Sequence, residues 1–226
     1  MNKLLIILVF CATTLPCLAQ TPEPGKGDPT AIIDTTEGKL HCTIFEKETP
    51  NAAANFIGLA DGTKDWRSPV THQTKHGVPL YNGTIFHRVI PGFMIQGGDP
   101  MGNGMGDAGY NLKNGEILPT LIFDRPGRMA YANSGAPDTS SSQFFITEVP
   151  TPFLNGNYII FGQCDPATVE LVKKIARMPR DQRPGPTQDR PFTPVKINSI
   201  MIQRGGTAPA KAPAKPAAAA STQKKQ

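Results

Sequence analysis

The chain has 226 residues, a formal net charge of +5, 38% hydrophobic residues and 7% aromatic residues. Lys3 and the four lysines that follow residue 205 account for the whole excess charge, so residues 20–204 are neutral overall. This distribution excludes a strongly basic face on the folded part, and we expect no nucleic-acid partner.

Residues 1–19 have the pattern of an export signal. Lys3 precedes an apolar run from Leu4 to Phe10, and Cys17-Leu18-Ala19 ends in a small residue suited to cleavage. Because polar residues and a proline break this segment, it is too short for the about 20 apolar residues that a membrane span needs. We predict a signal peptide, no stable membrane span and an exported, periplasmic or secreted protein. A retained anchor and a lipid-modified Cys17 are the alternatives.

Beyond the signal, the sequence predicts a linker over 20–29, one domain over 30–203 and a tail over 204–226. The domain's length of roughly 175 residues is enough to bury a sizeable core. The tail is rich in alanine, proline and lysine and, from residue 205 on, has no large apolar residue, so we expect it to be disordered. We interpret it as a solubilising extension rather than a means of weak attachment to an anionic surface.

The domain begins with a predicted hairpin. Residues 31–36 and 39–45 flank the turn residues Glu37-Gly38, and the apolar positions of the second strand alternate. A helix follows: Thr49 is the expected N-cap residue, Pro50 occupies the first position, and Asp61-Gly62 ends the element.

The rest of the chain alternates between short strands and loops. Residues 63–81 are polar with glycine and proline, which predicts a long surface loop. A second helix is expected from Asp165-Pro166. Further strands are predicted at 84–90, 93–97, 128–133, 143–148, 158–163 and 193–203. Many short strands with two helices are typical of a mainly β antiparallel barrel or sandwich.

Two cysteines remain after the signal, Cys42 and Cys164, and both lie in apolar stretches. We expect small buried free thiols. Export would also permit a disulfide between them, because exported proteins reach oxidising compartments.

The segment from Phe86 to Pro100 is the most informative in the chain. It places the permanently charged guanidinium of Arg88 close to the amide of Gln96, with Phe93 and Met94 between them. This combination indicates a site that binds a neutral group and directs one strong donor toward it. The sequence has no nucleophile–base set and no metal-ligand cluster, so we expect neither a metal nor a cofactor.

Three ordered blocks resemble the cyclophilins, which are peptidyl-prolyl cis-trans isomerases. They are F-H-R-V-I-P-G-F-M-I-Q-G-G-D at 86–99, S-S-Q-F-F-I-T at 141–147 and L-N-G-N-Y-I-I-F-G at 154–162. The resemblance implies a closed eight-stranded antiparallel β-barrel capped by two α-helices. It also implies isomerisation of X-Pro bonds in Pro-containing peptides and unfolded exported proteins, and we expect a monomer.

The resemblance implies a role for particular residues of this chain. Arg88 would be the catalytic guanidinium, Gln96 would bind substrate backbone, and Asn133 would pair with an extended peptide through its own backbone. Phe153 and Tyr158 stand where many members have tryptophan and histidine. The other implied substrate-binding residues are Phe93, Met94, Ala132, Phe145 and Leu154.

The alternative function is a cyclophilin-fold chaperone or binding module that recognises Pro-containing segments without catalysis. Such a protein has no need of Arg88. Because Arg88 is present together with the apolar residues and Gln96, the sequence favours the enzyme.

Overall fold

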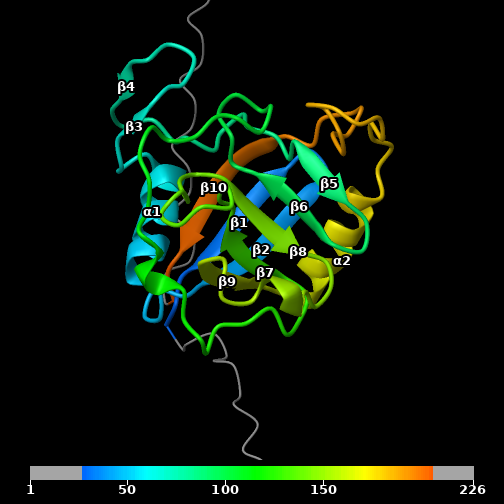
Figure 1. The fold of residues 1–226 in the computed structure, drawn as a ribbon. Helices are drawn as coiled ribbons and strands as arrows, with labels where there is room; N and C mark the ends of the chain where they lie inside the picture. The colour runs from blue at the N-terminus through cyan, green and yellow to red at the C-terminus, as the bar shows by residue number, and fades with distance from the viewer. Residues whose placement is uncertain (1–26, 206–226) are drawn as a thin grey trace, which may run out of the picture.

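A computed structural model describes residues 27–205 (Figure 1). The predicted signal peptide, most of the linker and all but the first two residues of the tail lie outside the described residues. The strands are β1 (Thr30–Thr35), β2 (Gly38–Ile44), β3 (Trp66–Arg67), β4 (Thr74–Lys75), β5 (Arg88–Ile90), β6 (Met94–Gly97), β7 (Arg128–Tyr131), β8 (Phe144–Thr147), β9 (Ile160–Cys164) and β10 (Ile197–Gln203). The helices are α1 (Pro50–Asp61), α2 (Pro166–Ala176) and the short 3₁₀ turns η1 (Asn114–Glu116) and η2 (Pro152–Leu154).

Eight strands form one antiparallel sheet in the order β10-β1-β2-β9-β7-β8-β6-β5. The sheet curls between α1 on one side and α2 on the other, as Figure 1 shows. The prediction of a mainly β protein with two helices is confirmed. Among residues 27–205, neither helix is long and apolar enough to cross a bilayer.

The prediction of a closed barrel is wrong, because the sheet is an open, curled half-barrel whose edge strands are β10 and β5. The segment before β5 meets only the start of β10: Ile85 forms an isolated bridge with Lys196, and the N–H of Ile197 donates to the carbonyl of Thr84. β5 has three residues, and the N–H of Val89 donates to the carbonyl of Asp189, 2.8 Å away. A loop therefore takes the edge position that β10 would need to occupy for closure.

Both helices start where the sequence predicts, but different kinds of side chain accept hydrogen bonds from their first N–H groups. Asp165 caps α2 by accepting from the N–H of Thr168. Thr49 makes no such bond in α1; its hydroxyl donates to the carbonyl of Phe45 instead. The carboxylate of Glu116, 65 residues further along the chain, accepts from the N–H of Asn51 at 2.8 Å. Thr49 is the N-cap residue of α1, as predicted, but its side chain makes no capping bond, and a distant carboxylate accepts from the first N–H groups instead.

The region 63–81 is not wholly irregular, which corrects the prediction of a loop. Its β3 and β4 pair into a two-stranded antiparallel hairpin apart from the main sheet. The indole N–H of Trp66 donates to the carbonyl of Val78, and His76 lies 2.7 Å from the carboxylate of Asp65. These contacts close the segment on itself.

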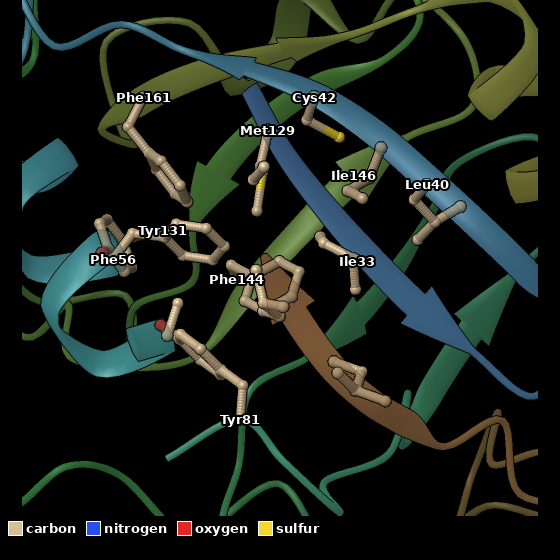
Figure 2. Packing of buried hydrophobic residues seen from close by; sticks show 14 of the residues in the cluster. Ile33, Leu40, Cys42, Phe56, Tyr81, Met129, Tyr131, Phe144, Ile146 and Phe161 are labelled. Atoms are coloured by element: carbon tan, nitrogen blue, oxygen red, sulfur yellow. The ribbon is translucent and has the colours of Figure 1, made fainter. Parts of the chain in front are cut away.

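Strands β6 to β9 are buried on both faces, and this is what positions the site. Alternate residues point into an inner cluster, which includes Phe56, Tyr131, Phe144 and Phe161 (Figure 2). Their neighbours along the same strands point the other way into a second, smaller cluster. That outer cluster comprises Phe45, Met94, Leu121, Phe123, Ala130, Phe145, Leu154 and Ile160. Because both faces are largely covered, these strands are mostly apolar rather than strictly alternating.

Cys42 and Cys164 are joined by a disulfide, so the prediction of free thiols is wrong. The two residues lie directly opposite each other on the antiparallel neighbours β2 and β9. Directly opposite positions bring the Cβ atoms within the reach of a disulfide. This pairing depends on strand order, which the sequence alone did not supply.

Candidate active site

A row of side chains crosses the sheet on its outer face. Arg88 on β5 lies opposite Gln96 on β6, Gln96 lies opposite Phe145 on β8, and Phe145 lies opposite Ala130 on β7. Directly paired residues share a face of the sheet. Strand pairing therefore sets one guanidinium, one amide and one aromatic ring side by side.

An apolar pocket with a volume of about 100 Å³ opens beside Arg88. Met94, Phe145 and Leu154 are 1%, 5% and 8% exposed and form its buried wall. The complete lining is Arg88, Phe93, Met94, Gln96, Ala132, Asn133, Phe145, Leu154 and Tyr158. Nine of the ten sequence-predicted site residues therefore line one pocket.

Phe153 is the exception. It stands on the turn η2 and is 69% exposed, outside the pocket lining. Its ring centroid lies 5.6 Å from that of Phe93, so Phe153 covers the outer side of a pocket residue rather than the pocket itself.

Aromatic packing fixes the pocket wall from behind. Phe123 stacks on Phe145 with ring centroids 5.8 Å apart, and Tyr158 meets Phe145 edge-on at 5.4 Å. Offset stacking and edge-to-face contact are the favourable geometries for aromatic pairs. The ring of Phe145 is thus confined from two directions.

A chain of amides extends from Arg88. Its Nη1 donates to Oε1 of Gln96 at 3.4 Å, and Nε2 of Gln96 donates to Oε1 of Gln143 at 2.9 Å. Gln143 in turn donates to the carbonyls of Gly104 and Gly106. Because each side-chain amide is hydrogen-bonded to the next, one network connects the guanidinium of Arg88 to the loop around Gly104.

Asn133 lines the pocket, and both ends of its side-chain amide are engaged in hydrogen bonds elsewhere. The side-chain amide donates to the carbonyl of Asn157, and its oxygen accepts from the N–H of Gly135. Within the described residues, no hydrogen bond uses the backbone N–H or carbonyl of Asn133.

His87, next to Arg88, is an unsuitable proton carrier at neutral pH. It is 7% exposed, and its burial lowers the pKa of the imidazole below the ordinary 6.5. The nearby guanidiniums of Arg190 and Arg88 lower this pKa further, while the carboxylate of Asp99 opposes them. The ring is therefore neutral at pH 7.

Sequence analysis missed three residues that shape the site. Gln143 stands two positions before Phe145 in the second block, a strand spacing that puts both on one face and could have identified it. Phe123 lies in an irregular segment with no such signal. Glu148 is 2% exposed, and its carboxylate accepts from the N–H of Gly92, beside Phe93.

Comparisons with known proteins agree with this geometry. The family model described as cyclophilin type peptidyl-prolyl cis-trans isomerase/CLD matches residues 30–202. Peptidyl-prolyl cis-trans isomerase A of Mycobacterium tuberculosis is 44% identical over 174 residues, which cover 76% of this chain and 91% of that protein. Isomerase B of Streptomyces anulatus is 41% identical over 174 residues, which cover 76% of this chain and 95% of that protein.

A solved structure has the same fold. The crystal structure of a Cryptosporidium parvum cyclophilin-type isomerase, determined in the presence of the dipeptide Ala-Pro, superposes with a TM-score of 0.64 at 34% identity. The match covers 77% of this chain and 98% of that chain. The curled sheet, the pocket beside Arg88 and these relatives together show that the chain belongs to the cyclophilin-type peptidyl-prolyl cis-trans isomerases.

Proposed function

We propose that this enzyme accelerates rotation about X-Pro bonds by directing the guanidinium of Arg88 at the prolyl nitrogen. Rotation about a peptide bond faces a barrier of roughly 18–20 kcal/mol because the nitrogen lone pair is shared with the carbonyl. In the twisted amide the nitrogen regains that lone pair. A hydrogen bond to it forms only in the transition state, which is the condition for raising the rate.

The position of Arg88 at the rim of an apolar pocket is the observation that supports this role. The small volume and the buried wall of Met94, Phe145 and Leu154 suit a proline ring. Within the described residues, Arg88 forms no ion pair with a carboxylate, and its partner is the neutral amide of Gln96. A guanidinium in that state can donate to a weak acceptor in a partly dry site, where such a bond is strengthened.

The other residues hold the peptide around the turning bond. Phe93, Met94, Phe145, Leu154 and Tyr158 enclose the ring. Asn133 pairs with an extended segment through its backbone, Ala132 contacts the same segment, and Gln96 contacts the substrate backbone. Phe153 gives an exposed aromatic contact at the entrance. The mechanism uses no nucleophile, metal or cofactor, since no covalent bond breaks.

The test is the exchange rate of an X-Pro peptide, measured by NMR. Arg88→Ala should lower kcat/KM by about 100-fold, since loss of one donor to a transition state costs a factor on the order of 100 to 1,000. Arg67→Ala is the matched control, because Arg67 lies on the separate hairpin, where its Nε donates to the carbonyl of His72. Full activity in Arg88→Ala, with unchanged folding, would overturn the assignment. Peptide binding without exchange in the wild type would favour the non-catalytic binding module.

We also propose that the protein is exported, as a periplasmic or secreted folding assistant. The pattern of residues 1–19 supports export, and so does the disulfide between Cys42 and Cys164, because disulfides persist in oxidising compartments. The check is fractionation of cells that express the full chain, with mass spectrometry of the mature N-terminus, expected at Gln20. A protein retained in the cytosol with an intact Met1 terminus would refute export.

A further inference from the structure

A second cavity, of about 460 Å³, adjoins the pocket beside Arg88. It shares Arg88, Gln96 and Asn133 with that pocket, so a substrate seated there would reach both. One wall is formed by His87 and the loop at 102–104. The opposite wall is the segment 185–190, which follows α2 and has no part in the proposed mechanism.

The segment that forms this wall is fixed to the sheet. The carbonyl of Asp189 accepts from the N–H of Val89, the residue after Arg88. The backbones of Asp181 and Arg190 also pair, with 2.9 Å between the N–H of Asp181 and the carbonyl of Arg190. In Figure 1 the orange chain that follows α2 accordingly runs next to β5. Arg190 is therefore placed by the backbone, at a defined position relative to Arg88.

Positive charges around this cavity outnumber the carboxylates available to pair with them. The carboxylate of Asp189 is bonded to Nε of Arg180 at 3.2 Å, and that of Asp181 to Arg183 at 2.8 Å. The buried carboxylate of Asp99 accepts from three backbone N–H groups of the loop beside it. Within residues 27–205, neither Arg88 nor Arg190 has a carboxylate partner.

The two guanidiniums also act on the same ring, the imidazole of His87. Burial is the main cause of its lowered pKa, and the positive charges of Arg190 and Arg88 each lower it further. Two cations without carboxylate partners around a cavity with polar walls create a positive potential, which favours an anionic group of matching size.

We propose that the cavity between Arg88 and Arg190 is a specificity site for an acidic side chain that lies near the proline of the substrate. The inference rests on the proposed function above and narrows its substrate class. Glu and Asp residues within two positions of the proline would place a carboxylate between the two guanidiniums. Lysine at the same position would meet two like charges. The enzyme therefore distinguishes X-Pro bonds by the charge beside them.

The test uses acetylated and amidated peptides with one X-Pro bond, so that no terminal charge competes. Glu, Gln or Lys stands at each position within two residues of the proline, and kcat/KM is measured by NMR exchange. In the wild type, Glu should exceed Lys by about threefold to tenfold at one or more positions, the range expected for a partly exposed ion pair. Since salt shortens the Debye length to about 3 Å at 1 M, the ratio should approach one there.

Variants at Arg190 separate this effect from general electrostatics. Arg190→Gln should bring the Glu-to-Lys ratio close to one, Arg190→Lys should retain most of it, and Arg190→Glu should invert it. Lys39→Gln is the control for loss of one positive charge, because Lys39 is exposed on β2 and does not line the cavity. The melting temperature of each variant checks that the fold is intact.

The outcomes distinguish the two proposals. If the neutral peptide is isomerised but the ratio is near one in the wild type, or is the same in the wild type and Arg190→Gln, the specificity site is refuted and the catalytic role of Arg88 stands. If no peptide, neutral or charged, is isomerised, the proposed function itself fails, and the inference fails with it.

Discussion

Glu148 links the stability of the domain to the shape of the pocket beside Arg88. Its carboxylate, 2% exposed, accepts from the N–H of Gly92 at 3.0 Å and from Arg177 at 2.7 Å. Its own N–H donates to the carbonyl of Phe93, which lines the pocket. Glu148 thus fixes the turn between β5 and β6 from the end of β8, and replacing it should affect both folding and substrate binding.

The hydrogen bonds of Glu148 allow the loss of stability in its variants to be estimated. Glu148→Ala removes a charged acceptor from the N–H of Gly92, and hydrogen bonds to charged groups contribute about 1.5–3 kcal/mol. For a domain of this size, each kcal/mol corresponds to about 2–4 °C in Tm, so we expect a loss of about 3–12 °C. Glu148→Gln retains a neutral acceptor at this position, so its loss should be less than half as large. Because Phe93 lines the pocket and is proposed to bind the substrate rather than to act on the turning bond, KM should rise more than kcat falls.

The assays are thermal unfolding, monitored by circular dichroism, and NMR exchange over a range of peptide concentrations. The matched control is Glu170→Ala, which removes an exposed carboxylate from α2 and should leave both Tm and KM unchanged. A Glu148→Ala protein with wild-type Tm and KM would refute the reasoning. If Glu148→Gln were as unstable as Glu148→Ala, the negative charge of Glu148, rather than its hydrogen bond with Gly92, would account for the stabilisation.

Three further predictions concern the rest of the domain. Glu116→Ala removes the acceptor for the first N–H groups of α1 and should cost about 1 kcal/mol in urea unfolding, whereas Thr49→Val should leave the helix cap intact. Reduction of the disulfide between Cys42 and Cys164, which are separated by 122 positions, should lower the free energy of unfolding by about 2–4 kcal/mol, and an unchanged urea midpoint in reductant would contradict this. The buried imidazole of His87 has a pKa below 6.5, so the unfolded chain binds its proton first as the pH falls. Stability should therefore decrease from pH 7.5 to 5.5, and His87→Gln should flatten that decrease; equal slopes for the two proteins would rule out His87 as the cause.

Local patterns predicted much of this fold because they depend on neighbouring residues. The hairpin around Glu37-Gly38 and the helix that begins at Pro50 rely on turn chemistry, caps and periodicity, all of which act within a few positions. The family blocks likewise placed Arg88 and the apolar residues of the pocket, since each block spans only one or two strands.

Apart from the local hairpin of β3 and β4 and the omission of Gln143, the errors involve residues far apart in the chain. The open edge of the sheet depends on a loop residue, Asp189, that pairs with Val89. The cap of α1 comes from Glu116, and the disulfide needs β2 and β9 to be adjacent. No periodic signal in a sequence records which distant segments meet, so these features required the tertiary structure.

The sequence by itself determined the family, the mainly β class with two helices, and the residue types of the predicted site. Tertiary structure alone decided which of them share one pocket, that Gln143 connects Gln96 to the glycine-rich loop, and that Arg190 and Arg88 line the same second cavity. The physical reason is that the sequence gives the chemical type of each side chain directly. The distances between residues from distant segments, and the balance of charge around a cavity, are set only when strands and loops pack against one another.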